Sequence, residues 1–315
     1  MPTAIASVER LPHLLTLDGL GGDRIHALLD AAEALRPHAL GGTGLRQVLA
    51  GRTVCNLFFE SSTRTRSSFQ LAAQRLGADL LNFDVAASSL SKGESALDTL
   101  RSLRAMGVEA FVVRHAEDGA VAALAAAAEP GTALLNAGDG RSNHPTQGLL
   151  DLLTIRQHKG GDFSRLAVLI VGDVRHSRVA RSALHGLRQL GCRDIRVCAP
   201  VGLMPDAAEL AGCSHGTALD AMLEGVDVLM ALRLQRERME EGRVPSAAAY
   251  FNDYGLDERR LALARPGAIV LHPGPMNRGV EIASAVADGP QSAVLDQVAN
   301  GVAVRMAVLR HLLGA

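Results

Sequence analysis

The chain has 315 residues, of which 48% are hydrophobic, and its formal net charge at pH 7 is -1. A chain of this length can bury two hydrophobic cores, so we expect two domains. The balanced charge argues against nucleic acid or an anionic membrane as a partner, because both favour a basic surface. No uncharged run is as long as a signal peptide or a membrane span, so we expect a cytoplasmic protein with small-molecule ligands.

Short apolar runs alternate with helical patterns in the first half of the chain. We predict strands at residues 53–59, 79–83, 110–113 and 133–135. The segments between them have apolar residues at every third or fourth position, which is typical of helices. This alternation predicts a parallel sheet whose strands are joined by crossover helices.

The most informative segment lies where the first strand gives way to a helix, and it reads Phe-Glu-Ser-Ser-Thr-Arg-Thr-Arg at 59–66. A helix start leaves backbone N–H groups without partners and carries partial positive charge, so it stabilises an anion. Ser62, Thr63 and Thr65 add hydroxyl donors, and Arg64 and Arg66 add guanidinium groups suited to phosphate. Taken alone, the segment also fits a capping serine followed by solvated arginines.

Lysine is rare in this chain, because only Lys92 and Lys159 among the 32 basic residues are lysine. Lys159 lies at an expected helix end, where a cation suits the helix dipole. Lys92 lies in a loop of small residues that follows the predicted strand at 79–83. This loop is either a plain surface loop or a functional one.

A second series of apolar runs predicts strands at 166–171, 194–198, 226–230 and 268–271. The helix between the two series begins near 145–148 and runs to His158, before a Lys-Gly-Gly-Asp stop. We therefore predict two open α/β units with their boundary near this helix. The amphipathic segment at 292–312 could pack on either unit by its pattern alone.

Polar residues follow the predicted strands in both series, and ligands of open α/β sheets bind beyond the carboxyl ends of strands. These residues are Arg114, His115, His144, Gln147, Arg178, Arg233, Gln235 and His272. Carboxylate pairs with metal-ligand spacing, a G-x-S-x-G turn and a Walker-type phosphate loop are missing. We expect an anion site without metal or cofactor. A dinucleotide enzyme is the weaker alternative, because the turn after 166–171 lacks G-x-G-x-x-G.

Four cysteines, Cys55, Cys192, Cys198 and Cys213, form no C-x-x-C pair and have no matching histidine cluster. We expect reduced thiols that are buried as small hydrophobic side chains.

Six motifs stand out along the chain. They are the segment at 58–66, Ser-Lys-Gly-Glu at 91–94, Arg-His at 114–115, His-Pro-Thr-Gln at 144–147, Arg-Leu-Gln-Arg-Glu-Arg at 233–238 and His-Pro-Gly-Pro at 272–275. Together they resemble the catalytic chains of aspartate carbamoyltransferases. The similarity runs from about residue 10 to the C-terminus. Ornithine carbamoyltransferases share Ser-Thr-Arg-Thr-Arg and His-Pro-Thr-Gln. The guanidinium groups of Arg178 and Arg233, however, suit a dicarboxylate acceptor and would repel a cationic one.

The resemblance implies two open parallel-sheet α/β domains, with the C-terminal helix packing back on the first domain. A carbamoyl-phosphate-binding domain would comprise residues 1–147 and 293–315, and an aspartate-binding domain residues 148–292. The catalytic residues it implies are Arg64, Thr65, Lys92, Arg114 and His144. The substrate-binding residues it implies are these five together with Ser62, Thr63, Ser89, Gln147, Arg178, Arg233, Gln235, Gly274 and Pro275.

The implied reaction transfers the carbamoyl group of carbamoyl phosphate to the amino group of L-aspartate, without a covalent intermediate, early in pyrimidine biosynthesis. The family is trimeric, and a loop bearing Lys92 and either Ser88 or Ser89 would enter the neighbouring subunit's site. The sequence does not decide whether a regulatory or dihydroorotase-type partner chain binds. Two alternative functions also remain, a sister transcarbamylase with another acceptor and a catalytically silent scaffold.

Overall fold

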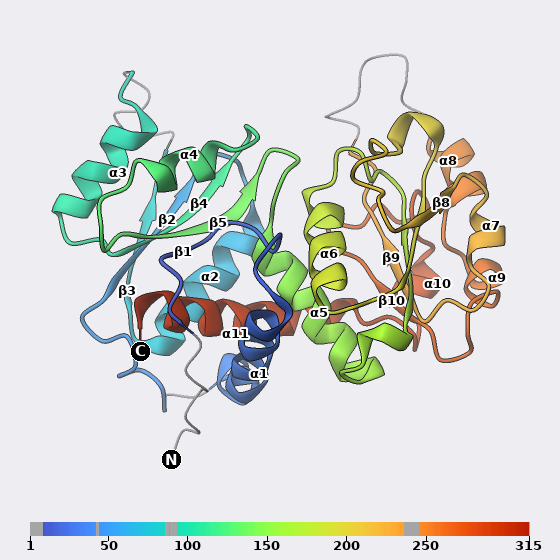
Figure 1. The fold of residues 1–315 in the computed structure, drawn as a ribbon, viewed down its shortest axis with the longest axis horizontal. Helices are drawn as coiled ribbons and strands as arrows, with labels where there is room; N and C mark the ends of the chain where they lie inside the picture. Colours follow the sequence, from blue (N-terminus) through green and yellow to red (C-terminus); the bar gives the residue numbers. More distant parts are fainter. Residues whose placement is uncertain (1–8, 42–43, 86–87, 89–92, 236–245, 315) are drawn as a thin grey trace. The chain divides into compact units, whose positions relative to one another are not determined.

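The computed structural model describes residues 9–41, 44–85, 88, 93–235 and 246–314. The chain divides into two compact units: unit 1 comprises Met1–Leu150 and Ala299–Ala315, and unit 2 comprises Asp151–Val298. Each unit contains one five-stranded sheet (Figure 1). Among the helices of the described segments, none combines the length and the apolar character that a membrane crossing requires.

Unit 1 has a parallel sheet with the strand order β1-β5-β4-β2-β3. Its elements are β1 (His13–Leu14), α1 (Gly22–Ala39), β2 (Thr53–Phe58), α2 (Thr63–Leu76), β3 (Asp79–Phe83), α3 (Ala96–Ala105), β4 (Ala110–His115), α4 (Ala120–Ala126) and β5 (Ala133–Asp139). Two longer helices, α5 (Pro145–Lys159) and α11 (Val294–Leu313), each contribute residues to both units.

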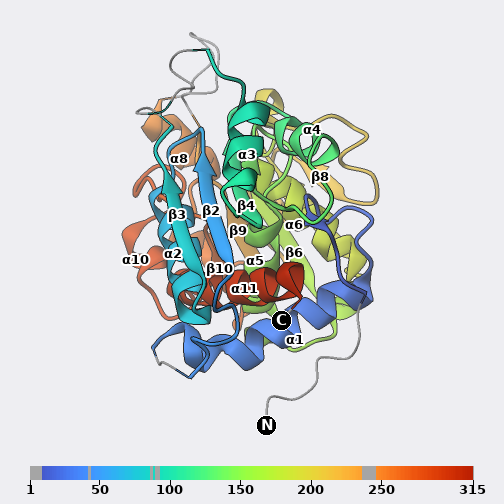
Figure 2. The same ribbon diagram turned by 90° about the vertical axis from the view of Figure 1, so that its left-hand side faces the viewer.

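The sheet of unit 1 is covered on both faces. Alternate residues of a strand face opposite ways, and Cys55 and Leu57 of β2 share a buried core with Leu100 of α3 and Val121 of α4. On the other face, the Arg305 guanidinium of α11 lies 5.0 Å from the centre of the Phe69 ring of α2. Figures 1 and 2 show α3 and α4 on one side of this sheet, and α2 and α11 on the other. The predicted packing of the C-terminal helix on the first domain is confirmed.

Unit 2 has a second parallel sheet, with the order β10-β9-β6-β7-β8. Its strands are β6 (Ala167–Val171), β7 (Asp194–Cys198), β8 (Ser214–Gly216), β9 (Val228–Ala231) and β10 (Ile269–Leu271). Its helices are α6 (Arg178–Gln189), α7 (Leu219–Met222), α8 (Ala247–Tyr254), α9 (Glu258–Leu261) and α10 (Ser284–Ala287), with short 3-10 turns at Phe163–Arg165 and Val201–Leu203. Leu169, Leu229 and Val270 of the sheet pack with Leu219 of α7 and Val286 of α10.

The structure confirms the two α/β units and all eight predicted strands, and it adds two strands that the pattern did not predict. These are β1 and β8, which have two and three residues and are therefore too short to show alternation. Each lies at the edge of its sheet. Arg114 and His115 were expected after a strand but lie within β4. The apolar run ends at Val113, whereas backbone pairing continues, because Phe58 is registered with Arg114.

Both sheets contain a strand where the order of the chain reverses. In unit 1, β2 lies between β3 and β4, and in unit 2, β6 lies between β7 and β9. The loops that follow two such neighbouring strands leave in opposite directions, and the opening between them is where open α/β proteins bind ligands. The topology therefore points to the ends of β2 and β4 in unit 1, and of β6 and β9 in unit 2.

Candidate functional site

The start of α2 in unit 1 is a set of hydrogen-bond donors at the carboxyl end of β2. Ser62 is the N-cap residue with an extended backbone, and its side chain makes no capping hydrogen bond. The first turn contains no acidic residue that would neutralise the positive end of the helix dipole. Thr65 is buried, whereas Arg64 and Arg66 are exposed. Backbone N–H groups, hydroxyls and guanidinium groups therefore gather where an anion is stabilised.

Arg114 is held at the end of the neighbouring strand β4. Its Nη2 donates to Glu60 Oε1 at 2.8 Å, and its Nη1 donates to the Ala137 carbonyl of β5 at 3.3 Å. The Phe59 N–H donates to the Arg114 carbonyl at 2.8 Å, which ties the segment before α2 to β4. Sequence reasoning gave no role to Glu60. The sequence did contain one indication, because Glu60 is the single acidic residue in a segment, 59–66, that otherwise suits an anion.

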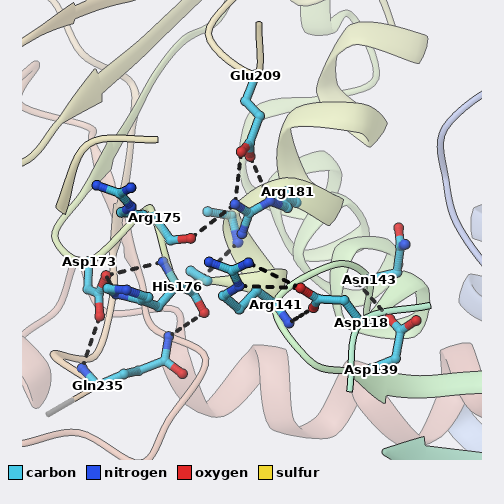
Figure 3. A network of polar contacts seen from close by, with 12 residues as sticks. Asp118, Asp139, Arg141, Asn143, Asp173, Arg175, His176, Arg181, Glu209 and Gln235 are labelled. Atoms are coloured by element: carbon cyan, nitrogen blue, oxygen red, sulfur yellow. Dashed lines mark hydrogen bonds and ion pairs between the residues drawn. The ribbon is translucent and has the colours of Figure 1, made fainter. Parts of the chain in front are cut away.

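His144 and Gln147, at the start of α5, are both buried. The Gln147 N–H donates to the His144 carbonyl at 2.9 Å, so the two residues belong to one helical turn. The turn before His144 is held by Asp139, whose carboxylate accepts from the N–H groups of Gly119 at 3.1 Å and Asn143 at 3.0 Å. Figure 3 shows Asn143 beside Asp139.

Asp118 also holds the turn before His144, through hydrogen bonds from Arg141. Its carboxylate accepts from the backbone N–H of Arg141 and, at 3.3 Å, from the Arg141 guanidinium (Figure 3). Burial tends to raise the pKa of Asp118, but the hydrogen bonds from Arg141 and Ser142 outweigh it and lower that pKa. Gly140 has a φ of 42°, and any side chain there would collide with Asp118. The turn that leads into His144 is thus tightly determined.

In unit 2, the loops after β6 and β9 are joined through Asp173. This fully buried carboxylate accepts from His176 Nδ1 at 2.8 Å and from the Gln235 N–H at 3.3 Å. The Gln235 side chain donates to the His176 carbonyl at 3.0 Å (Figure 3). Burial raises the pKa of Asp173, although the nearby His176 opposes this. Gly172 has a φ of 125°, and a side chain there would approach the Leu232 carbonyl to 2.9 Å.

Arg178 is the first residue of α6 and is buried. Ser177 caps this helix by accepting from the Ala180 N–H at 3.1 Å. One turn later, Arg181 donates to Glu209 at 2.9 Å and to the Arg175 carbonyl at 3.0 Å (Figure 3). Arg181 therefore has a structural role, in which it holds the segment before α6 to Glu209.

The segment after β10 carries Gly274 and Pro275, which are partly buried and exposed, respectively. The Gly274 N–H donates to His272 Nδ1 at 2.9 Å, and His272 is buried.

The structure thus brings Arg114 together with Phe59 and Glu60, just before α2, in unit 1. In unit 2 it brings Gln235 together with Asp173 and His176. Ser89, Lys92 and residues 236–238 lie outside the described residues. Ser88 is described, and its hydroxyl donates to the Val85 carbonyl at 2.7 Å. Within the described segments, no group of three or more His, Cys, Asp or Glu residues could hold a metal ion.

The cysteines follow the prediction except for Cys213. Burial raises the pKa of the Cys55, Cys192 and Cys198 thiols to about 12. Cys213 is only partly buried, so the expectation that all four thiols are buried is wrong. It directly precedes β8, a short edge strand with exposed residues.

The fold is that of an open α/β protein, with hydrogen-bond donors and arginines at the ends of its strands. The chain belongs to the aspartate/ornithine carbamoyltransferase family. Residues 12–157 match the model of the family's carbamoyl-P binding domain, and residues 164–312 match the model of its Asp/Orn binding domain.

Similar proteins include enzymes of both branches of this family. The aspartate carbamoyltransferase catalytic subunit of Stenotrophomonas maltophilia strain K279a is 68% identical over 306 residues, which cover 97% of each chain. That of Xanthomonas axonopodis pv. citri is 68% identical over 305 residues, again 97% of each chain. Aspartate transcarbamoylase from Trypanosoma cruzi, in complex with N-(phosphonacetyl)-L-aspartic acid, has a TM-score of 0.85 at 33% identity, over 96% of this chain and 95% of that one. Ornithine carbamoyltransferase from Thermus thermophilus has a TM-score of 0.84 at 28% identity, over 97% of this chain and 100% of that one.

Proposed function

We propose that this chain transfers the carbamoyl group of carbamoyl phosphate to the amino group of L-aspartate, giving N-carbamoyl-L-aspartate and phosphate. The observation that carries this proposal is the 68% identity to aspartate carbamoyltransferase catalytic subunits over 97% of the chain. The fold alone does not choose the acceptor, because an ornithine enzyme matches with a TM-score of 0.84. Arginines after β6 and β9 favour a dicarboxylate acceptor over a cationic one.

Carbamoyl phosphate would bind in unit 1. We assign its phosphate to the α2 start, through Ser62, Thr63, Arg64 and Thr65, because this helix start offers donors and no first-turn acid. We assign its carbamoyl group to the buried donors Arg114, His144 and Gln147.

L-Aspartate would bind in unit 2. We assign its two carboxylates to Arg178, Arg233 and Gln235, with Pro275 lining the same region. The backbone carbonyl of Gly274 would accept a hydrogen bond from the aspartate amine and orient its lone pair. The bonds of Asp173 to both loops support this assignment, because they fix Gln235 beside the segment that leads to Arg178.

The chemistry needs no covalent enzyme intermediate. The uncharged amine nitrogen attacks the carbonyl carbon, a C–N bond forms, and the C–O bond to the phosphate breaks. Negative charge grows on the carbonyl oxygen, where Thr65, Arg114 and His144 would stabilise it. His144 acts as a donor rather than a base, since the departing phosphate can take the amine proton. Holding two anionic substrates together supplies much of the remaining acceleration.

A colorimetric assay for the ureido group tests this function. Purified protein should form a ureido product from carbamoyl phosphate with L-aspartate, but not with L-ornithine and not without an acceptor. Product with ornithine alone would assign a sister activity. No product with either acceptor would indicate a catalytically silent chain.

We also propose a cytoplasmic homotrimer with shared active sites, in which Lys92, with Ser89, serves a neighbouring subunit. The support is the family resemblance of the Ser-Lys-Gly-Glu segment at 91–94. Inactive Arg114→Ala and Lys92→Ala proteins should regain activity when their subunits are mixed, because some sites then receive both intact residues. No recovery after verified subunit exchange would contradict sharing. The relatives are named catalytic subunits, which supports testing for a regulatory or dihydroorotase-type partner by copurification.

A further inference from the structure

The segment after β10 is organised around His272, which is only 2% exposed. Its backbone N–H donates to Gln297 Oε1 of α11 at 2.9 Å. Gln297 in turn donates to Asp151 of α5 at 2.6 Å. These three residues lie within unit 2, so His272 is attached to the parts of α5 and α11 that belong to this unit.

The hydrogen bonds of the imidazole define its tautomer. The Gly274 N–H can only donate, and it points to His272 Nδ1 at 2.9 Å, so Nδ1 carries a lone pair. The ring proton therefore lies on Nε2, which is 3.2 Å from Glu281 Oε1 and donates to it. The same Oε1 atom accepts from the Asn277 N–H.

Glu281 is itself anchored outside this segment. The Leu256 N–H donates to the Glu281 carbonyl at 3.0 Å, and the Ala283 N–H donates to the Leu256 carbonyl at 2.9 Å. Glu281 is 2% exposed, so water does not compete strongly for its carboxylate. A continuous chain of bonds thus runs from a fixed backbone through Glu281 and His272 to the Gly274 N–H.

We propose that Glu281 is a positioning residue for the acceptor substrate. Through the His272 imidazole and the Asn277 N–H, it fixes the backbone at Gly274 and hence the carbonyl that receives the aspartate amine. This inference rests on the proposed function. Small displacements of an orienting group cost large factors in rate, and orienting groups depend on supporting hydrogen bonds behind them.

Two substitutions of nearly equal length test the role. Glu281→Gln keeps an oxygen that can occupy the Oε1 position and accept both bonds, whereas Glu281→Met removes the acceptor. We expect Glu281→Met to raise the KM for aspartate roughly 10- to 100-fold, the effect typical of a misplaced orienting group. In Glu281→Met, the KM for carbamoyl phosphate should stay within about twofold of the wild-type value. In Glu281→Gln, the KM values for aspartate and for carbamoyl phosphate should both stay within about threefold of wild type.

Succinate separates orientation of the amine from general damage, because it has both carboxylates of aspartate but no amine. Its inhibition constant against aspartate should be unchanged in Glu281→Met. A collapsed segment would weaken succinate and aspartate together. His272→Asn provides a second variant, since its side-chain oxygen can still accept from Gly274 but cannot reach Glu281. Its effect and that of Glu281→Met should be non-additive in the double variant.

Several results would overturn the proposal. They are an unchanged aspartate KM in both Glu281→Met and His272→Asn, a parallel loss of succinate affinity, and impairment of Glu281→Gln equal to that of Glu281→Met. If Glu281→Met does not fold, as judged by thermal melting, the test rests on His272→Asn alone. The same two constants, the KM for aspartate and the inhibition constant for succinate, then decide. If wild-type protein carbamoylates no aspartate, the proposed function fails first, and this inference fails with it.

Discussion

Both units contain a five-stranded parallel sheet, but the candidate binding groups at the strand ends are held in different ways. In unit 1, the groups assigned to phosphate sit at a helix start that Ser62 does not cap with its side chain, so backbone geometry supplies much of the site. In unit 2, the assigned groups are held from behind by buried carboxylates, Asp173 at 0% and Glu281 at 2% exposure. Unit 1 also has a buried acid, Asp139, but that residue holds the turn before His144.

This difference has a chemical reason. Phosphate is a compact anion with several equivalent oxygens, so a cluster of donors with partial charge binds it in a defined place. An amino-acid acceptor has an amine and two carboxylates that must be told apart. Its site therefore requires individually oriented side chains, and orientation requires supporting bonds. We expect substitutions in unit 1 to change charge stabilisation, and those in unit 2 to change acceptor placement.

The largest expected effect is in unit 1. Arg114→Ala should lower kcat roughly 10²- to 10³-fold, the typical loss when one donor to the developing oxyanion is removed. Steady-state kinetics at saturating aspartate and carbamoyl phosphate measure this. Arg101→Ala on α3 is the matched control, since the Arg101 side chain is 53% exposed and its ion pair with Asp98 spans 4.0 Å. A near wild-type kcat in Arg114→Ala would show that Arg114 does not stabilise the transition state.

In unit 2, Arg233→Ala should raise the KM for aspartate roughly 10- to 100-fold, because a hydrogen bond to a charged group contributes about 1.5–3 kcal/mol. The KM for carbamoyl phosphate should change little. Arg259→Ala is the control, because Arg259 is 60% exposed and pairs with Asp220 at the surface of the same unit. If both Michaelis constants rose equally in Arg233→Ala, the assignment of aspartate to this unit would be wrong.

A smaller effect concerns the pH dependence of stability. Burial raises the pKa of Asp173 in the folded protein, so the folded state binds the proton more tightly than the unfolded state does. Its contribution is fully present below the unfolded pKa of about 3.9 and is lost as pH rises through the raised folded pKa. Denaturant unfolding across this range should show the wild type losing stability relative to Asp173→Asn. An unfolding free-energy difference that is independent of pH would show that Asp173 does not titrate abnormally.

The sequence alone was sufficient for the features that depend on neighbours along the chain. The strand predicted at 53–59 is observed at Thr53–Phe58, and the helix predicted to run to His158 ends at Lys159. Both agree to within one residue, because local apolar spacing and the Gly residues after Lys159 set these bounds. The arginine-rich strand ends were also visible, because polar residues follow apolar runs.

The supporting contacts were not predictable in the same way. Glu60 meets Arg114 across 54 positions, and Asp173 meets Gln235 across 62. Both contacts depend on strand order, namely that β2 lies beside β4 and β6 beside β9, and local patterns do not determine this order. The bond between His272 and Glu281 spans only nine positions, but it requires the path of an irregular segment, which periodicity does not describe.

The smallest expected effect, native thiol labelling, reports on unit 2 alone. Cys55, the cysteine of unit 1, is buried, and so are Cys192 and Cys198 of unit 2, whereas Cys213 is partly exposed. A thiol with a pKa of about 12 is ionised to only about one part in 10⁴ at pH 8, and the thiolate is the reactive form. Iodoacetamide should therefore modify one thiol in the folded protein and four after unfolding, as counted by intact mass. Cys213→Ser should lose the native label and retain activity. Rapid modification of Cys55 would instead show that the core of unit 1 opens in the native protein, and the label would then no longer report on unit 2 alone.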